Sequence, residues 1–189
     1  RMLVHNEQVV REYLQWAMCG TPRPKGTFKL YAVEGGTAAM CYIFKSMKTN
    51  RLLNAGDTIA LGTPIFTPYL EMPHLEDYDL KIVNIPSTQE NRWQFDDAEL
   101  DKLLDPKIKA FFLVNPGNPS AVALSAKTIA KIGAIIKKRP DLILLTDDVY
   151  GTFVPGFRSL LGAFPYNTIG VYSYSKYFGC TGWRLGVIA

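Results

Sequence analysis

Three side chains in this sequence combine a reactive group with a position beside an apolar run: Lys176, Asp147 and Asp148. A lysine amine that is buried near other cations has a lowered pKa and acts as a nucleophile. Two adjacent carboxylates repel each other, so one of them needs a partner or solvent, and a protonated ring nitrogen would be such a partner. Taken alone, a lysine is more often a solvated surface residue, and an aspartate here equally often caps a helix.

Two further features are suited to binding an anion. The turn Gly35-Gly36-Thr37 leads into a helical pattern, where free backbone N–H groups and the helix dipole attract phosphate, although a plain tight turn is the alternative. The turn lacks both the lysine of a Walker loop and the spacing of the dinucleotide fingerprint. Arg184 lies eight residues after Lys176, and its planar guanidinium binds phosphate with two hydrogen bonds.

The elements that must position these residues alternate between strand-like runs and helical patterns, which predicts an α/β domain with a mostly parallel sheet. Continuous apolar runs, such as residues 111–114, indicate strands buried on both faces. The last two runs are too close in sequence for a crossover helix, so these strands are either antiparallel or not neighbours. The predicted strands are Phe28–Glu34, Asp57–Leu61, Leu80–Ile85, Ala110–Asn115, Leu142–Thr146, Thr168–Ser173 and Leu185–Ala189.

Helices are predicted from apolar spacing and from residues that start or end a helix. The clearest is Ser125–Lys138, because Ser125 can cap it and basic residues close it before Pro140. Pro64 is tolerated as the first residue of another helix. The remaining predictions are Asn6–Met18, Thr37–Met47, Pro64–His74 and Asp96–Leu104.

The candidate residues gather where predicted strands end. In open α/β sheets, ligands bind beyond the carboxyl ends of the strands. Four polar segments follow the first, fourth, fifth and sixth strands, and we expect them to meet in one crevice. They are residues 34–37, 115–120, 147–150 and 173–176.

Composition limits the class of protein. The chain has 189 residues, 48% of them apolar and 20% charged, which suits one soluble domain. The net charge of +4 comes without a basic run, and no apolar stretch reaches the roughly 20 residues of a membrane span, so neither nucleic acid nor membrane is expected as a partner. Cys19, Cys41 and Cys180 are widely spaced, which predicts reduced thiols in a cytoplasmic protein and no metal site.

Three motifs, in this order, resemble those of fold-type I pyridoxal-phosphate enzymes of the aspartate aminotransferase superfamily: residues 115–120, 147–150 and 173–186. The resemblance implies the large domain of that fold, a three-layer αβα sandwich whose seven-stranded sheet has one antiparallel member. The chain begins with Arg1 and ends in an apolar run without a cap. We therefore expect residues 1–189 to be a fragment that lacks an N-terminal region and a small C-terminal domain.

The resemblance also implies roles around pyridoxal 5′-phosphate. Lys176 would carry the cofactor and move the substrate's α-proton, Asp147 would pair with the ring nitrogen, and Asn118 and Tyr150 would bind the ring's 3′ oxygen. Phe66 would stack on the ring, although Phe66 and Tyr150 could each be simple core aromatics. The phosphate would be held by Gly36, Thr37, Ser173 and Arg184, with Gly35 beside them.

Other segments resemble the aspartate 4-decarboxylase subgroup, namely residues 35–41, 61–69 and 146–153, and Ser120-Ala121 stands where aminotransferases usually carry Thr-Gly. This implies β-decarboxylation of L-aspartate to L-alanine and carbon dioxide, with aminotransferase activity on the side, in a homo-oligomer that is a dimer or larger. A class I aminotransferase acting on an amino acid and a 2-oxo acid is the alternative.

Two other classes of function are alternatives for this sequence. Ser173-x-x-Lys176 fits the first motif of serine acyl enzymes, but the S-D-N and K-T-G motifs that complete that set do not follow. A non-catalytic binding domain is the second class, and the fragment alone could be inactive. The residues that bind the substrate carboxylates are not identified, because no motif places Arg23 or Arg51.

Overall fold

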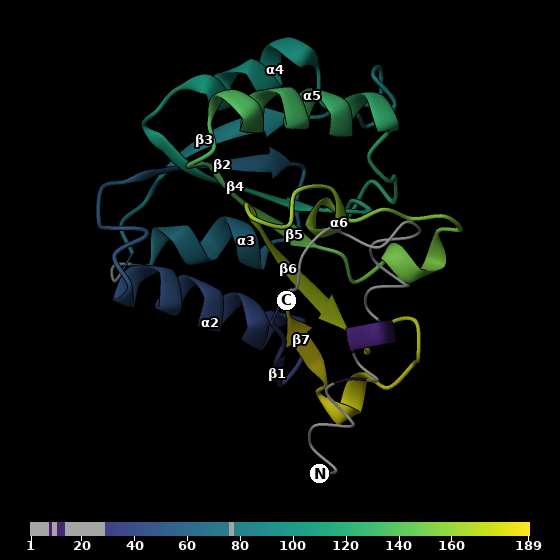
Figure 1. The fold of residues 1–189 in the computed structure, drawn as a ribbon. Coiled ribbons are helices and arrows are strands. Elements are labelled where there is room, and N and C mark those ends of the chain that lie inside the picture. Colours follow the sequence, from purple (N-terminus) through teal and green to yellow (C-terminus); the bar gives the residue numbers. More distant parts are fainter. Residues whose placement is uncertain (1–7, 9–10, 14–28, 76–77) are drawn as a thin grey trace.

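A computed structural model describes Gln8, residues 11–13, residues 29–75 and residues 78–189 (Figure 1). Its centre is a seven-stranded sheet with the order β1-β7-β6-β5-β4-β2-β3. The α/β class and the mostly parallel sheet are confirmed. The strands are β1 (Tyr31–Val33), β2 (Thr58–Thr63), β3 (Lys81–Pro86), β4 (Ile108–Val114), β5 (Ile143–Asp147), β6 (Thr168–Ser173) and β7 (Gly186–Ile188).

Strand β7 is the antiparallel member of the sheet. It pairs antiparallel with β6 on one side and with β1 on the other, while the β2–β3, β2–β4, β4–β5 and β5–β6 pairs are parallel. Of the two arrangements left open by the sequence, the structure has antiparallel neighbours. Consequently β1, β4, β5 and β6 all run in one direction, and their carboxyl ends lie at one edge of the sheet.

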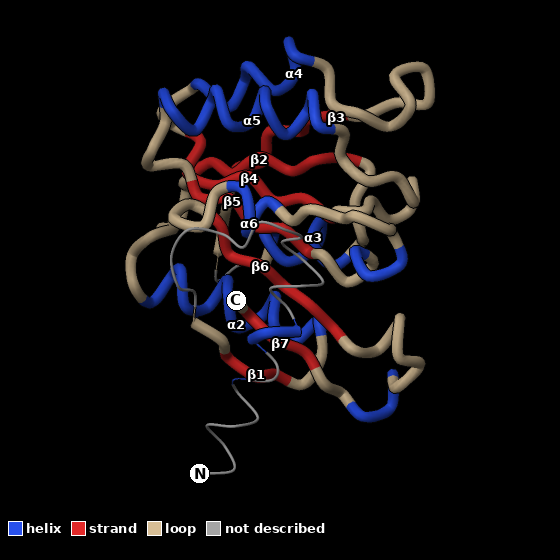
Figure 2. Tube along the Cα trace, turned by 45° about the vertical axis from the view of Figure 1, so that its right-hand side comes forward, coloured by secondary structure: helices blue, strands red, loops and turns tan. Residues whose placement is uncertain are grey.

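Helices cover both faces of the sheet, which confirms the three layers (Figures 1 and 2). Alternate residues of β4 point to opposite layers: Phe112 packs in the core beneath α2 (Gly36–Thr49) and α3 (Pro68–Glu71), and Phe111 packs beneath α5 (Ala126–Lys138). Burial on both faces explains the continuous apolar runs of the central strands.

The predicted helices are present within the described residues, with one boundary wrong. Ser125 caps α5, because its Oγ accepts a hydrogen bond from the Thr128 N–H at 3.1 Å. The helix predicted from Pro64 begins instead at Pro68, because a helix starting at Pro64 would place the Pro68 ring against the carbonyl four residues earlier. It continues as the 3₁₀ turn Met72–His74, and Asp96–Leu104 likewise forms α4 (Asp97–Asp101) and the 3₁₀ turn Lys102–Leu104.

Some short elements were not predicted, and some predictions lie outside the described residues. Helix α6 (Leu160–Ala163) and the 3₁₀ turns Gly151–Phe153 and Thr181–Trp183 are too short to show a helical period. Most of the predicted helix Asn6–Met18, and Phe28 of the first predicted strand, lie outside the described residues, as do Cys19 and Arg23.

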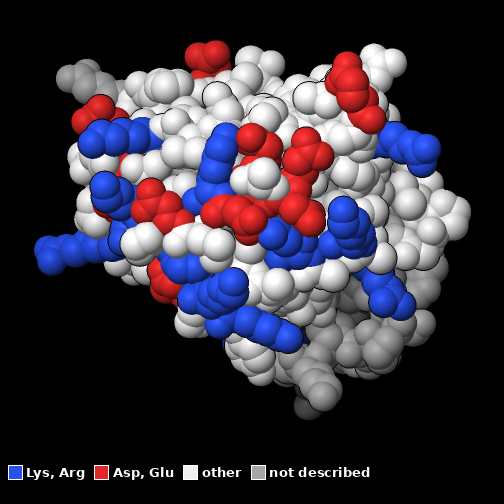
Figure 3. All heavy atoms as spheres, turned by 90° about the horizontal axis from the view of Figure 1, so that it is seen from above, with Lys and Arg blue, Asp and Glu red and all other residues white. Residues whose placement is uncertain are grey.

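The outer face formed by α4 and α5 carries both signs of charge, interspersed (Figure 3). There the Lys131 Nζ lies 2.7 Å from Asp101 Oδ1, and the Lys127 Nζ lies 3.9 Å from Asp97 Oδ2. Among the described residues, no helix is long and apolar enough to cross a membrane.

A glycine contact joins the last strand to the turn that opens α2. A Cβ built on Gly186 would lie 2.8 Å from the carbonyl carbon and 2.9 Å from the Cα of Gly35. Because both atoms belong to the backbone, they cannot move away as a flexible side chain would. Only glycine at position 186 allows β7 to approach the turn so closely.

We therefore expect Gly186→Ala to lower the free energy of unfolding by about 1–3 kcal/mol, the usual range for overpacking. Chemical denaturation of the chain measures this loss. Gly182→Ala is the matched control, because a Cβ at Gly182 meets nothing within 4 Å. Equal stability of the two variants would contradict the close approach.

Candidate active site

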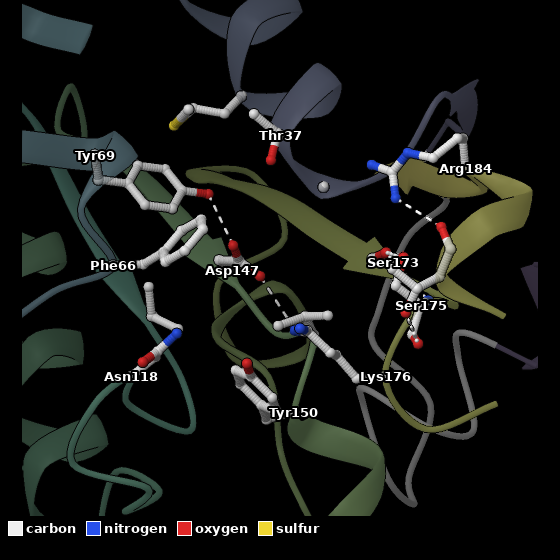
Figure 4. A pocket seen from close by; sticks show the side chains of 15 residues that line it. Thr37, Phe66, Tyr69, Asn118, Asp147, Tyr150, Ser173, Ser175, Lys176 and Arg184 are labelled. Atoms are coloured by element: carbon white, nitrogen blue, oxygen red, sulfur yellow. Dashed lines mark hydrogen bonds between the residues drawn. The ribbon is translucent and has the colours of Figure 1, made fainter. Parts of the chain in front are cut away.

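The predicted residues meet in one cavity at the carboxyl edge of the sheet, with a volume of about 200 Å³. Every residue predicted to bind the cofactor lines this sheet-edge cavity except Gly35, which lies against the Arg184 guanidinium. The crevice expected from the strand ends is therefore present, and it receives residues that follow β1, β2, β4, β5, β6 and the loop before β7. Figure 4 shows these side chains pointing toward a common space.

One end of the cavity is arranged to hold an anion. Thr37, Ser173 and Arg184 lie at this end (Figure 4). Helix α2 has 14 residues and no acidic residue in its first turn, and the N–H groups of that turn have no intrahelical acceptor. Gly35 has a φ of 94°, and a Cβ there would lie 2.3 Å from Nη2 of Arg184, so a side chain at this position would displace the guanidinium.

Arg184 is held in place by backbone carbonyls. Its Nη1 donates to the Thr181 carbonyl at 2.8 Å, and its Nη2 donates to the Glu34 carbonyl at 3.2 Å. Arg184 itself has a φ of 52°, in the left-handed region. The guanidinium thus links the loop before β7 to the turn after β1, and these two carbonyls fix its orientation.

The loop that carries Lys176 is folded by its own hydroxyl groups. Ser173 Oγ donates to Ser175 Oγ at 3.0 Å, and Thr181 Oγ1 donates to the Ser175 carbonyl at 2.8 Å. These bonds turn the chain directly after β6, so that Lys176 reaches the cavity from the strand end. In Figure 4 the Lys176 side chain lies beside Asp147 and Tyr150. Its side chain is exposed, so it is open to a ligand.

The two adjacent aspartates differ in what they face. Asp147 ends β5 and lines the cavity, whereas Asp148 does not line it and is fully buried. Asp147 Oδ1 accepts from the Val149 N–H at 3.2 Å, and its Oδ2 accepts from the Tyr69 hydroxyl at 3.0 Å. Burial raises the pKa of Asp147 to about 6, and these two donors oppose the rise.

Asp148 is fully buried, and its two carboxyl oxygens differ in their partners. Its Oδ1 accepts from the Thr146 hydroxyl at 2.5 Å, and its Oδ2 has no hydrogen-bond partner within the described part of the chain. Burial raises the pKa of Asp148 to about 7, and the neighbouring Asp147 adds to the rise. The repulsion expected from the sequence is thus relieved by keeping one carboxyl in the core and turning the other to the cavity.

The other end of the cavity is lined by aromatic rings and a side-chain amide. Phe66, Asn118 and Tyr150 lie there (Figure 4). The loop that carries Asn118 is tied back at its start, because Asn115 Oδ1 accepts from the Leu124 N–H at 3.0 Å. Phe66 is 39% exposed, so one face of its ring is available to a ligand.

The sequence analysis missed several residues of the cavity. Tyr69 is the most telling of these, since its hydroxyl contacts Asp147 and it lies three residues after Phe66 in a helical turn. Within the helix predicted over Pro64–His74, that spacing would place both rings on one side, and this pattern could have identified Tyr69. In the structure Phe66 precedes α3, and the Tyr69 N–H donates to its carbonyl at 2.9 Å. The other missed lining residues are Met40, Val114, Val149, Ser175 and Thr181.

The arrangement suits a flat, phosphorylated ring with a basic nitrogen. The cavity has a buried carboxylate at its base and an anion cradle at one end. Aromatic and amide groups lie at the other end, with a primary amine beside them. This set of groups is complementary to pyridoxal 5′-phosphate. Among the described residues, no cluster of three His, Cys, Asp or Glu side chains could hold a metal ion.

Comparison with known proteins identifies the family of the chain. The family described as aminotransferase class I and II matches residues 32–189. A bifunctional aspartate aminotransferase and L-aspartate beta-decarboxylase of Pseudomonas sp is 55% identical over 190 residues, which cover the whole chain but 36% of that relative. An aspartate aminotransferase of Pyrococcus abyssi is 33% identical over 149 residues, 76% of this chain and 37% of that enzyme.

Solved structures give the same fold. An aromatic aminotransferase from Pyrococcus horikoshii has a TM-score of 0.80 at 25% identity, and the match covers 97% of this chain and 48% of that one. A PLP-dependent aminotransferase from Streptococcus suis, at 22% identity and a TM-score of 0.74, shares the fold over 85% of this chain and 41% of its own. The chain therefore spans less than half the length of these relatives.

The raised pKa of Asp148 predicts a pH-dependent stability. Between its ordinary value of 3.8 and about 7, the unfolded carboxyl is ionised while the folded one keeps its proton, so the folded state loses stability as pH rises. Asp148→Asn removes this titration. We expect the variant to gain stability over the wild type between pH 4 and 7, by up to about 1.4 kcal/mol per pH unit.

Urea unfolding at several pH values measures the difference between the two proteins, and titrations common to both cancel. The difference should level off above pH 7, where Asp148 is ionised in both states. A difference that stays constant from pH 4 to 7 would show that Asp148 does not bind a proton on folding.

Proposed function

Because the chain belongs to the class I and II aminotransferase family, we propose that it binds pyridoxal 5′-phosphate in the sheet-edge cavity and serves an enzyme that decarboxylates L-aspartate to L-alanine. The observation that carries the proposal is the meeting of Lys176, Asp147 and the Arg184 cradle in one cavity. The residues 1–189 would form the large, cofactor-binding domain of that enzyme.

Each end of the cavity has a part in holding the cofactor. Gly36, Thr37, Ser173 and Arg184 would bind the phosphate, with Gly35 giving the guanidinium room. Asn118 and Tyr150 would hydrogen-bond the 3′ oxygen, and Phe66 would cover one face of the ring. When bound, pyridoxal phosphate supplies an electron-withdrawing ring that stabilises negative charge next to the substrate's amino group.

Two residues would handle protons. The Asp147 carboxylate would hold a proton on the ring nitrogen, and the dry surroundings that raise its pKa also strengthen its attraction to a cation. The Lys176 amine would carry the cofactor covalently, and, once displaced by substrate, its Nζ would accept the proton of the substrate α-carbon and return it.

Decarboxylation adds one bond change to this chemistry. The bond between the β-carbon of aspartate and its carboxylate breaks, carbon dioxide leaves, and the electron pair left on the β-carbon is protonated to give alanine. The 55% identity to the bifunctional Pseudomonas enzyme over the whole chain, against 29–33% for three aspartate aminotransferases, supports decarboxylation as an activity of the complete protein.

The proposal extends to the rest of the protein. The chain covers 36% of the Pseudomonas relative, so parts beyond residues 1–189 would supply the groups that grip the substrate carboxylates. We also propose a homo-oligomer, a dimer or larger, in the cytoplasm, where Cys41 and Cys180 would stay reduced as they are in the structure.

Replacing the lysine tests the cofactor assignment. We expect Lys176→Ala to abolish both the visible absorbance of covalently bound pyridoxal 5′-phosphate and the lysine label left by borohydride reduction, because no other lysine lines the cavity within the described residues. Lys127→Ala is the control, since that side chain is 83% exposed on α5. Peptide mass spectrometry locates the label. Equal labelling in the Lys176 variant, or none in the wild type, would contradict the assignment.

Carbon dioxide release separates the two reactions. With L-aspartate labelled at the β-carboxylate and no 2-oxo acid added, we expect the complete protein to release labelled carbon dioxide and alanine in equal amounts. A plain aminotransferase would release none and would turn over only when a 2-oxo acid accepts the amino group. That outcome would replace the decarboxylase proposal with the aminotransferase one.

A further inference from the structure

A buried tyrosine contacts the carboxylate at the base of the cavity. Tyr69 is 1% exposed, and its hydroxyl donates to Asp147 Oδ2 at 3.0 Å. Figure 4 shows the phenol pointing at Asp147 from the side opposite Lys176. Because the Val149 N–H occupies the other carboxylate oxygen at 3.2 Å, each oxygen of Asp147 has one donor from the protein.

We propose that Tyr69 is a positioning residue, which fixes the orientation of the Asp147 carboxylate and so sets how firmly Asp147 binds a protonated ring nitrogen. The inference rests on the proposed function in naming the ring nitrogen as the partner of Asp147. The hydrogen bond itself belongs to the chain without any ligand.

The local fold explains how Tyr69 reaches this place. Its N–H donates to the Phe66 carbonyl at 2.9 Å, in the turn that begins α3. The Phe66 and Tyr69 rings are 6.5 Å apart between centroids, with an interplanar angle of 67°. One helical turn therefore supplies both an aromatic face to the cavity and a hydrogen-bond donor to its carboxylate. Any shift of this turn would move both groups together.

The pKa shifts of Tyr69 and Asp147 show in which direction their hydrogen bond acts. Burial raises the pKa of Tyr69 well above its ordinary value of 10, and the nearby Asp147 raises it further, so the phenol stays neutral and acts as a donor. A donor stabilises the ionised form of Asp147 and opposes the burial that raises its pKa to about 6. A protonated Asp147 could not pair with a cation. The hydroxyl of Tyr69 therefore favours the form of Asp147 that the site needs.

Tyr69→Phe isolates this role, because it removes the hydroxyl and keeps the buried ring. Tyr172→Phe is the matched control: Tyr172 is also 1% exposed, and its hydroxyl contacts Tyr13 and Thr152 at 3.0 and 2.7 Å, away from Asp147. Both variants lose one buried phenolic hydroxyl, so a general loss of stability would affect both.

The first measurement uses the chain without cofactor. Carbon-13 NMR of the aspartate carboxyls follows the titration of Asp147, which an Asp147→Asn spectrum assigns. We expect Tyr69→Phe to raise the pKa of Asp147 by about one unit, since a hydrogen bond to a charged group corresponds to roughly a tenfold effect or more. Tyr172→Phe should leave it unchanged. Asp148 and Lys176 are the neighbouring titratable groups, and they are the same in all three proteins.

The second measurement adds pyridoxal 5′-phosphate labelled with nitrogen-15 in its ring. We expect Tyr69→Phe to bind it about tenfold more weakly and to show a smaller fraction of protonated ring nitrogen at pH 8. An unchanged Asp147 titration in Tyr69→Phe would overturn the proposal, whatever happens to stability. If the wild type fails to bind the cofactor while the titration shifts as expected, the proposed function fails and the Tyr69–Asp147 coupling stands.

Discussion

The site depends on a carboxylate that is buried at the end of a central strand. Asp147 is 6% exposed, and the two groups that donate to it, the Tyr69 hydroxyl and the Val149 N–H, are both neutral. Taking a carboxylate out of water without a cation is unfavourable by several kcal/mol, and two neutral hydrogen bonds offset only part of this. The raised pKa of Asp147 is the result. A cationic ligand in the cavity would complete the set of partners.

The sheet imposes the position of that carboxylate. The parallel pairs β4–β5 and β5–β6 bring the ends of three strands to one edge, and the two faces of these strands pack in the two core clusters. The antiparallel strand β7 then returns to the same region and delivers Arg184 beside the turn after β1. The amine, the acid and the anion cradle thus converge because of strand direction, although they are far apart along the chain.

Much of this arrangement could be predicted from the sequence, for identifiable reasons. Strands buried on both faces leave unbroken apolar runs, and the polar residues that follow them mark the carboxyl edge, so Lys176, Asp147 and Asn118 could be found without coordinates. Prediction from the sequence failed for two kinds of feature: a choice between two nearby helix starts, and a contact between residues far apart in the sequence. Helix α3 begins at Pro68 and not at Pro64, because the Pro68 ring inside a longer helix would clash with the carbonyl four residues earlier. The pairing of Tyr69 with Asp147 spans 78 residues and leaves no periodic trace. The choice of Asp147 over Asp148 came from the family resemblance alone, because the apolar run does not show at which residue β5 ends.

The hydrogen bond from Arg184 to the Glu34 carbonyl has a consequence for folding order. It joins residues that are 150 positions apart in the sequence. Contacts between distant segments form only after the entropy of closing the intervening loop has been overcome. The anion cradle is therefore complete only when both ends of the domain have been joined through β7. A phosphate bound there would stabilise the finished domain over any partly folded form, because only the finished domain has the cradle.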